Sequence, residues 1–164
     1  MTGKAILVRI LESGREMKIR KFKIADYDAA YALWRKTPNV GLNDIDDSRE
    51  GIAKYLKRNP HTSFVAELDG EIVGTIMCGN DGRRGYIHHT CVTPEFRHNG
   101  IGTSLVKKAL AALESVGITK AALVVFKCNK GGNSFWEEMG FTTRLDLVYR
   151  NKSLVASERK LHVL

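Results

Sequence analysis

The chain has 164 residues, of which 43% are hydrophobic and 27% are charged, and its formal net charge of +8 gives a pI of about 9.5. This length suffices for one domain with a substantial core, and the composition is that of a soluble globular protein. No apolar run approaches the roughly 20 residues of a membrane-spanning helix. The short apolar run at residues 5–8 is interrupted by Arg9 and lacks a cleavage-site pattern, so we expect no membrane partner and no signal peptide.

The first predicted elements define where the domain begins. We expect residues 1–16 to be an N-terminal extension and residues 17–164 to form one domain, with a first strand at residues 17–22. Within the extension, residues 5–11 fit either an added strand or a short helix, and the sequence does not decide between them.

Two helices are predicted after the first strand. Asp26 or Asp28 can cap a helix that runs to Lys36 and ends before Pro38. The segment 46–48, with sequence Asp-Asp-Ser, can cap a second helix that ends near residue 58.

A run of strands follows. Residues 61–68 and 71–78 have strand composition, and the Asp69-Gly70 pair between them is typical of a hairpin turn. Residues 85–92 are rich in β-branched and aromatic residues and form the next predicted strand.

The C-terminal third alternates helices and strands. Helical spacing predicts a helix over residues 101–116 that ends at Gly117. Residues 121–126 are almost all apolar and predict a buried strand. A short helix at residues 131–139 and final strands at residues 142–149 complete the pattern, which by periodicity alone is a single α/β or α+β domain.

The turn between the strand 85–92 and the helix 101–116 has the chemistry of an anion site. Residues 97–102 read Arg-His-Asn-Gly-Ile-Gly, and glycines allow backbone N–H groups to approach a ligand closely. The helix N-terminus adds free N–H donors and a positive dipole end, so the turn predicts a phosphate or pyrophosphate pocket. A Walker A loop is excluded because no Gly-Lys-Ser/Thr follows, and Leu105 replaces the third glycine of a dinucleotide fingerprint.

A second segment narrows the choice of ligand. Residues 129–141 read Asn-Lys-Gly-Gly-Asn-Ser-Phe-Trp-Glu-Glu-Met-Gly-Phe, and together with the Arg-x-x-Gly-x-Gly turn they resemble the GNAT superfamily of N-acetyltransferases. The resemblance covers about residues 17–152. It implies an α/β (α+β) single domain, with a mixed, mostly antiparallel sheet flanked by helices on both faces, and an enzyme that uses acetyl-CoA as co-substrate. Segment 79–85 resembles a bacterial subgroup of uncertain substrate.

The resemblance also implies which residues bind coenzyme A. They are Thr90, Cys91 and Val92 beside the pantetheine arm, Arg97, His98, Asn99, Gly100, Ile101, Gly102 and Thr103 around the pyrophosphate, and Asn129 at the end of the next strand. The N–H of Val92 would face the thioester carbonyl, where a donor stabilises an oxyanion. The basic surface would attract this anionic ligand, and scattered basic residues without interleaved aromatics argue against nucleic acid as the main partner.

The catalytic base is expected on the same strand. Strand residues alternate faces, so Tyr86, His88 and Thr90 should share the face of Val92, and His88 is the best candidate because imidazole titrates near neutrality. Histidines occupy corresponding places in the arylalkylamine acetyltransferases of this superfamily. Tyr86 is the second candidate, and water could serve instead. His89 would point the opposite way, into the core or to the surface.

The general acid departs from the family pattern. Trp136 stands where the superfamily often has a tyrosine, and an indole N–H donates a hydrogen bond but does not ionise. Tyr149, Tyr86 or water would have to protonate the leaving thiolate. Cys91 is a poor candidate for a covalent acetyl acceptor because no base should lie beside it.

The cysteine and histidine pattern limits other chemistry. Cys78, Cys91 and Cys128 are widely spaced without a Cys-x-x-Cys pair, which predicts buried, reduced thiols and a cytoplasmic location. The adjacent His88 and His89 should face opposite sides of a strand, so we expect no metal site.

The expected function is transfer of acetyl from acetyl-CoA to a primary amine of a small molecule or peptide by direct attack. Asp44, Asp46, Asp47 and Glu50 could receive a cationic amine, or could serve only as helix caps and solvated surface. The alternatives are a protein N-terminal (ribosomal-protein-type) acetyltransferase, a coenzyme A-binding protein without turnover, which Trp136 favours, and a basic nucleic-acid-binding protein. A homodimer is expected because the last strand needs a partner or edge protection.

Overall fold

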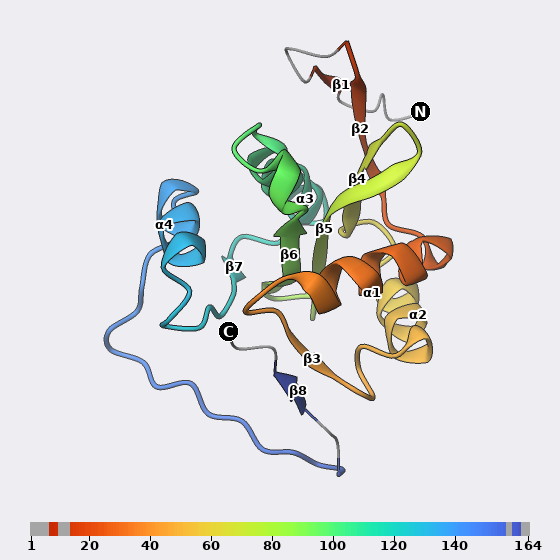
Figure 1. Ribbon diagram of the computed structural model, residues 1–164. Helices are drawn as coiled ribbons and strands as arrows, with labels where there is room; N and C mark the ends of the chain where they lie inside the picture. The colour runs from red at the N-terminus through yellow and green to blue at the C-terminus, as the bar shows by residue number, and fades with distance from the viewer. Residues whose placement is uncertain (1–6, 10–13, 157–158, 162–164) are drawn as a thin grey trace.

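The computed structural model describes residues 7–9, 14–156 and 159–161. Its main sheet has six strands in the order β1-β2-β4-β5-β6-β7, and a separate pair joins β3 to β8 (Figure 1). The strands are β1 (Leu7–Arg9), β2 (Glu16–Lys21), β3 (Gly41–Asn43), β4 (Phe64–Leu68), β5 (Glu71–Asn80), β6 (Gly85–Val92), β7 (Ala121–Ala122) and β8 (Arg159–Leu161). Neighbours in the main sheet are antiparallel except β6 and β7, which are parallel.

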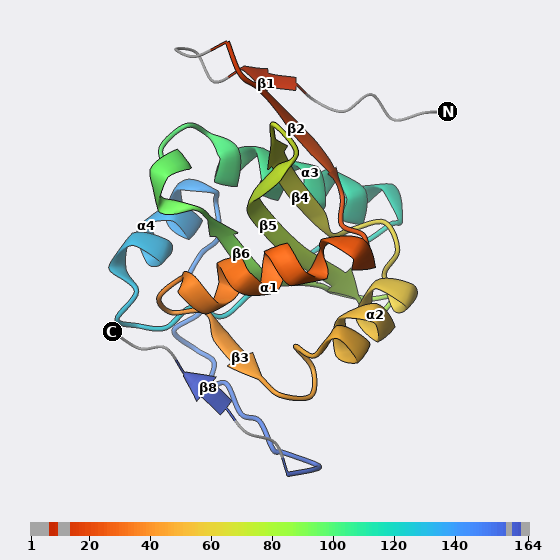
Figure 2. The same cartoon turned by 45° about the vertical axis from the view of Figure 1, so that its right-hand side comes forward.

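Helices cover both faces of this sheet. The helices are η1 (Ile24–Asp26), α1 (Tyr27–Lys36), α2 (Arg49–Arg58), η2 (Pro94–Phe96), α3 (Ile101–Ser115) and α4 (Lys130–Glu138). Helices α1 and α2 lie on one side of the sheet and α3 on the other, with α4 near the β6 edge (Figures 1 and 2). The mixed, mostly antiparallel sheet with helices on both faces is therefore confirmed.

Two hydrophobic clusters form the core, one on each face. The first lies under α3 and contains Met17, Ile19, Phe64, Ala66, Leu68, Val73, Ile76, Cys78, Ile87, Ile101, Leu105, Val106, Ala109, Leu113 and Ile118. The second lies under α1 and α2 and contains Phe22, Tyr27, Ala30, Leu33, Trp34, Val40, Leu42, Ile52, Val65, Met77 and Cys91. The helix α4 contributes partly buried side chains to the first cluster, including Phe135 and Trp136.

Local signals in the sequence placed several boundaries correctly. Asp69 and Gly70 both have positive φ, at 50° and 85°, as a tight hairpin turn requires. The Ser48 side chain accepts a hydrogen bond of 3.0 Å from the Gly51 N–H and caps α2. Gly117, at φ 80°, follows the end of α3.

A bulge in β6 changes which way its side chains point. Thr75 of β5 pairs with Cys91, but Met77 pairs with His88, so β6 has one more residue than β5 between these two pairs. His89 lies in this stretch with φ 43°, in the left-handed region.

The bulge reverses the alternation of β6. Ile87 packs in the cluster under α3, whereas Cys91, four residues later, packs in the cluster under α1. The predicted common face of Tyr86, His88, Thr90 and Val92 is therefore wrong, because the parity that holds up to His88 is lost beyond it.

The strand predicted at residues 121–126 is largely absent. Only Ala121 and Ala122 pair with β6, opposite Gly85 and Tyr86, and residues 123–126 then leave the sheet. The prediction of a buried strand is wrong beyond β7, since Val124 and Phe126 are 60% and 39% exposed. Among the described residues, β7 has β6 on one side and no strand on the other. No strand pairing therefore holds residues 123–126 in the sheet after they separate from β6.

The two ends of the chain also differ from expectation. Residues 142–156 contain neither helix nor strand, so the final strands predicted at 142–149 are wrong. Residues 7–9 of the N-terminal extension form β1 and pair with β2, so this part is a strand and not a helix. Residues 5, 6, 10 and 11, which were included in the same prediction, lie outside the described residues. The domain boundary at residue 17 stays a prediction.

The cysteines are free thiols, but they are not all buried. Cys78 and Cys91 are buried as predicted, whereas Cys128 is exposed, since it lies on the segment that leaves the sheet. In the described part of the chain, no helix combines the length and the apolar character needed to cross a membrane.

Candidate active site

The loop before α3 presents a series of free backbone donors. Gly100 precedes the helix at φ 76°, and His98 is also left-handed at φ 63°. The first helical hydrogen bond, 3.0 Å long, joins the Ser104 N–H to the Gly100 carbonyl. Within the described residues, the N–H groups of residues 98–103 donate no hydrogen bond. Such a run of unpartnered N–H groups at a helix N-terminus is suited to bind an anion.

Side-chain hydrogen bonds fix the shape of this loop. The Arg97 Nε donates to the Val92 carbonyl at 3.0 Å, and the Asn99 Nδ2 donates to the carbonyls of Phe96 and Arg97 at 3.2 and 3.0 Å. A Cβ on Gly102 would lie 3.3 Å from the ring of Phe135, so this glycine permits close packing of α4 against α3. The predicted loop residues are therefore brought together, and the backbone is rigidly held.

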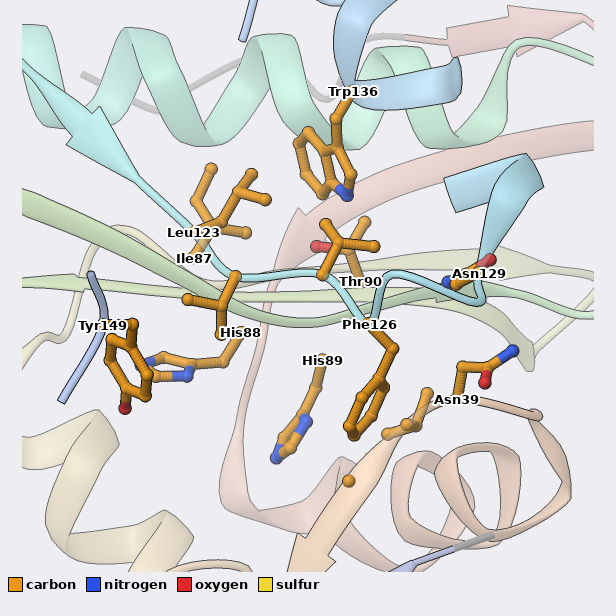
Figure 3. A pocket seen from close by; sticks show the side chains of 14 residues that line it. Asn39, Ile87, His88, His89, Thr90, Leu123, Phe126, Asn129, Trp136 and Tyr149 are labelled. Atoms are coloured by element: carbon orange, nitrogen blue, oxygen red, sulfur yellow. The ribbon is translucent and has the colours of Figure 1, made fainter. Parts of the chain in front are cut away.

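A cavity of about 400 Å³ opens where the segment 123–126 separates from β6 (Figure 3). It is lined by Asn39, Val40, Gly41, Ile87, His88, His89, Thr90, Leu123, Val124, Val125, Phe126, Asn129, Trp136 and Tyr149. Among the predicted site residues, His88, Thr90 and Asn129 lie at this cavity. The cavity thus depends on the strand divergence that the sequence did not predict.

Three polar groups at the cavity have unused hydrogen-bonding capacity. The Thr90 hydroxyl is buried and has no partner among the described residues. The Asn129 Oδ1 accepts from the Gly132 N–H at 2.9 Å and caps α4, which leaves its Nδ2 for another acceptor. Trp136 points toward the cavity from α4 (Figure 3). These groups could orient an elongated polar ligand.

His88 lies among aromatic rings. Its ring centroid is 4.7 Å from that of Tyr86 and 6.0 Å from that of Tyr55. Desolvation, followed by the nearby His89, lowers the pKa of His88 from 6.5 to about 4, and Asp47 only partly opposes this lowering. His88 as a residue is nevertheless exposed, so solvent screens part of this effect. His88 is neutral at pH 7, and its environment disfavours the charged form.

His89 is placed quite differently from the prediction. The expectation that it points away from His88 is wrong, because its left-handed backbone brings the two rings to 6.3 Å. Its Nε2 lies 2.5 Å from the Asp47 Oδ1, and the two side chains are 14% and 7% exposed. No sequence signal indicates this pair, because the bulge is not visible in strand spacing and Asp47 fits a helix cap equally well.

The remaining candidates lie in distinct environments. Tyr86 is half-buried, and desolvation followed by the nearby Tyr149 raises its pKa. Tyr149 lines the cavity and is 66% exposed. The Cys91 side chain instead faces α1, with its Sγ 3.4 Å from the Thr75 Oγ1, and burial raises the pKa of Cys91 to about 11. Cys91 is therefore not among the residues that line the cavity.

The described residues contain no group of three or more histidine, cysteine, aspartate or glutamate side chains arranged to hold a metal ion. His88 and His89 approach each other, contrary to the strand argument, but together with Asp47 beside His89 they do not form such a group.

Comparison with known proteins gives the family. Residues 27–141, which include the loop, the bulge and α4, match the Acetyltransferase (GNAT) family. The chain belongs to this family. The resemblance drawn from the two sequence segments is thereby confirmed.

Curated relatives support this membership over nearly the whole chain. An acetyltransferase of Pectobacterium atrosepticum is 32% identical over 139 residues, which are 85% of this chain and 96% of the relative. An acetyltransferase of Photorhabdus laumondii is 33% identical over 143 residues, covering 87% of this chain and 95% of the relative.

Solved structures share the fold at lower identity. Ard1 from Thermoplasma volcanium superposes with a TM-score of 0.69 at 20% identity and covers 77% of this chain and 82% of its own. The PaiA N-acetyltransferase from Thermoplasma acidophilum, solved in complex with coenzyme A, gives a TM-score of 0.67 at 20% identity, over 78% of this chain and 91% of its own. At this identity the likeness shows the fold alone.

Proposed function

We propose that this member of the GNAT family transfers acetyl from acetyl-CoA to a primary amine by direct attack. The observation that carries the proposal is the run of N–H groups at residues 98–103, which donate to no described residue, and the cavity lined by Thr90, whose hydroxyl also lacks a described partner, supports it. An anionic group at the loop and a polar chain in the cavity would satisfy both sets of donors.

The available groups fit coenzyme A. The loop N–H groups would hold its pyrophosphate, while Thr90, the Val92 backbone and the Asn129 Nδ2 would bind its pantetheine arm. When bound, acetyl-CoA supplies an activated acetyl thioester. The complex of the PaiA N-acetyltransferase with coenzyme A supports this choice of co-substrate.

The chain also offers groups for proton transfer. Trp136 can donate a hydrogen bond toward the cavity but cannot give up its proton in this pH range. Tyr149, Tyr86 or water therefore remains the proposed acid, and a neutral His88 remains a candidate base as expected from the sequence. The acceptor, a small-molecule or peptide amine, stays a prediction, as do the cytoplasmic location and the absence of nucleic acid among the main partners.

A coenzyme A-binding protein without turnover is the second candidate. Trp136 favours it, because a tyrosine at this position could protonate a leaving thiolate and the indole cannot. Both candidates require binding of the ligand, so they differ only in whether thiol is released when amines are added.

Thermal unfolding with and without acetyl-CoA tests the loop. At about 100-fold over the dissociation constant, acetyl-CoA should add roughly 2.7 kcal/mol, which is several degrees in a domain of this size. We expect this shift in the wild type and its loss in Gly100→Glu, because the new carboxylate enters the anion site.

Gly117→Glu is the matched control. Gly117 has φ 80° and nothing within 4 Å of a Cβ, as for Gly100 at φ 76°, so both substitutions cause similar backbone strain. The control should unfold at a lower temperature but keep the acetyl-CoA shift. A wild type without any shift would overturn the proposal, and binding of nucleic acid at graded salt would be the next measurement.

A further inference from the structure

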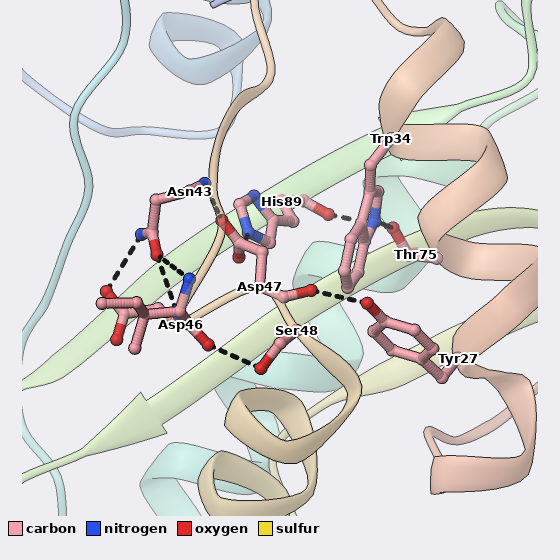
Figure 4. Close-up of polar contacts among 9 residues, drawn as sticks. Tyr27, Trp34, Asn43, Asp46, Asp47, Ser48, Thr75 and His89 are labelled. Atoms are coloured by element: carbon pink, nitrogen blue, oxygen red, sulfur yellow. Dashed lines mark hydrogen bonds and ion pairs between the residues drawn. The ribbon is translucent and has the colours of Figure 1, made fainter. Parts of the chain in front are cut away.

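We propose that His89, held by Asp47, is the base that accepts a proton from the acceptor ammonium group. This inference rests on the proposed function and assigns to His89 a role that sequence reasoning gave to His88. The two residues are neighbours on β6, but only His89 is part of a paired and supported side-chain arrangement (Figure 4).

The contact with Asp47 defines which nitrogen is available. An ionised carboxylate only accepts hydrogen bonds, so the 2.5 Å contact with the Asp47 Oδ1 places the proton of a neutral His89 on Nε2. The Nδ1 then carries the lone pair. This nitrogen has no hydrogen-bond partner among the described residues. Since it is not one of the fully buried polar atoms without a partner, it is accessible to solvent.

Asp47 is itself fixed by groups from two other elements. Its Oδ2 accepts from the Asn43 N–H at 2.7 Å, and its backbone carbonyl accepts from the Tyr27 hydroxyl at 2.7 Å. The carboxylate is therefore oriented before any ligand binds, and we assign Asp47 as a positioning residue.

The His89 ring and backbone are held as well. The ring lies 4.6 Å from the Trp34 ring, centroid to centroid. The Trp34 Nε1 donates to the Thr75 Oγ1 at 2.9 Å, and that hydroxyl donates to the His89 carbonyl at 2.9 Å. These contacts keep the left-handed residue in place and direct its side chain toward Asp47 (Figure 4), and His89 itself lines the cavity (Figure 3).

His88 lacks such support. It contacts Tyr55 and Tyr86 through ring packing, and no carboxylate of the described residues hydrogen-bonds its imidazole. A cation formed on His88 would be disfavoured by its surroundings, whereas one formed on His89 would face the carboxylate of Asp47.

The proposed step is a single proton transfer. One N–H bond of the acceptor ammonium breaks, and its electron pair remains on the amine nitrogen as the attacking lone pair. The proton forms a new N–H bond at the His89 Nδ1, so the positive charge moves from the ammonium to the imidazolium opposite Asp47. Solvent removes this proton afterwards.

The other titratable groups around the pair of His89 and Asp47 come from three elements. They are Asp46 from the segment before α2, His88 and Cys91 from β6, and Tyr27 from α1.

Steady-state kinetics across pH separates the two histidines. A positioned base typically contributes about 10²- to 10⁴-fold to the rate. We expect His89→Gln to lower kcat by about 100-fold or more with little change in KM for acetyl-CoA. In the wild type kcat should rise with pH, because the base must be unprotonated to act, and this rise should be lost in His89→Gln. The control His61→Gln, at an exposed histidine outside the cavity, should keep both that rise and the rate, whereas loss of the rise in His88→Gln and not in His89→Gln would refute the role of His89. Asp47→Asn should also lower kcat, because its amide can donate to Nε2 and place the proton on Nδ1.

Nitrogen NMR of the imidazoles provides a readout that does not depend on turnover. In the wild type at pH 8, we expect a protonated Nε2 and an unprotonated Nδ1 for His89, and a changed tautomer in Asp47→Asn. Addition of acetyl-CoA should move the His89 resonances but not those of His61, which contacts Lys21 outside the cavity.

The outcomes distinguish the two proposals. Absence of an acetyl-CoA thermal shift and of thiol release in the wild type would refute the proposed function. An active wild type whose His89→Gln variant keeps both its rate and its pH dependence would refute the role of His89 alone. A wild-type His89 protonated on Nδ1 at pH 8 would refute it as well, whether or not an acceptor has been found.

Discussion

The Thr90 hydroxyl is buried at the cavity wall, and no side chain or backbone group in the described part of the chain hydrogen-bonds it. A buried hydroxyl that makes no hydrogen bond costs free energy, and a ligand that supplies an acceptor recovers it. The same residue should therefore affect stability and binding in opposite directions.

We predict that Thr90→Val leaves the free energy of unfolding unchanged or raises it slightly, while weakening acetyl-CoA binding by about tenfold, the equivalent of roughly 1.4 kcal/mol. Calorimetry of binding and denaturant unfolding measure the two effects. Thr62→Val is the control, because the buried Thr62 hydroxyl already donates to the Cys78 carbonyl. That variant should lose about 1 kcal/mol of stability and keep its affinity. Equal losses of stability in both variants would contradict the assignment.

His88 gives a pH dependence of stability whose sign follows from its environment. Its pKa is about 4 in the folded chain against 6.5 as the ordinary value, so between these pH values the unfolded state binds more protons. The free energy of unfolding should therefore rise with pH across this window, and the contribution is lost as pH falls through it.

Urea titrations between pH 4 and 7 test this expectation. As pH rises through that window, the unfolding free energy of the wild type should increase relative to that of His88→Gln. His61→Gln is the control, since this histidine is exposed like His88 but lies outside the cavity. If the unfolding free energies of the wild type and His88→Gln change equally with pH across the window, His88 is not desolvated.

At the level of elements, local chemistry predicted most of the fold. The Asp69-Gly70 turn, the Ser48 cap of α2 and the end of α3 at Gly117 each depend on a few adjacent residues, and each is present in the structure. The loop before α3 was predicted for the same reason, since its glycines and the helix start are contiguous in sequence.

The features that were missed depend on contacts between distant residues. The bulge at His89 is a mismatch between β5 and β6, and neither strand shows it alone. Because of it, the pairing of His89 with Asp47, 42 residues away, could not be derived from alternation. Apolar composition likewise predicted a strand at residues 121–126, but composition does not reveal that, among the described strands, β6 alone lies beside it. The conformation of the loop before α3 was thus predictable, whereas the arrangement around the proposed base was not.

At the scale of the whole molecule, the C-terminal segment is the main unexplained surface. Its large hydrophobic side chains in residues 142–156 are highly exposed: Leu145 is 93%, Leu147 61%, Val148 77%, Tyr149 66%, Leu154 89% and Val155 63% exposed. Apolar side chains at this density on an extended segment mark an interaction surface, and the short β7 leaves an open sheet edge nearby.

We therefore predict a homodimer in which these segments are covered. Light scattering after size-exclusion chromatography should give twice the mass of 18.3 kDa for the wild type. The double variant Leu145→Asp with Leu147→Asp should shift toward the monomer, because charge is costly in a buried contact. Val116→Asp is the control, since Val116 is exposed at the end of α3, away from this segment. A wild type that elutes as a monomer at all concentrations would contradict the prediction.

The separation of residues 123–126 from β6 also bears on how long the protein survives in a cell. A co-substrate in the gap would act as a temporary neighbouring strand and make local opening of this edge more costly. Proteases cut exposed, locally opened segments most readily, so the empty form should be degraded sooner than the loaded form. The amount of the enzyme would then follow the supply of its acetyl donor without a separate regulator.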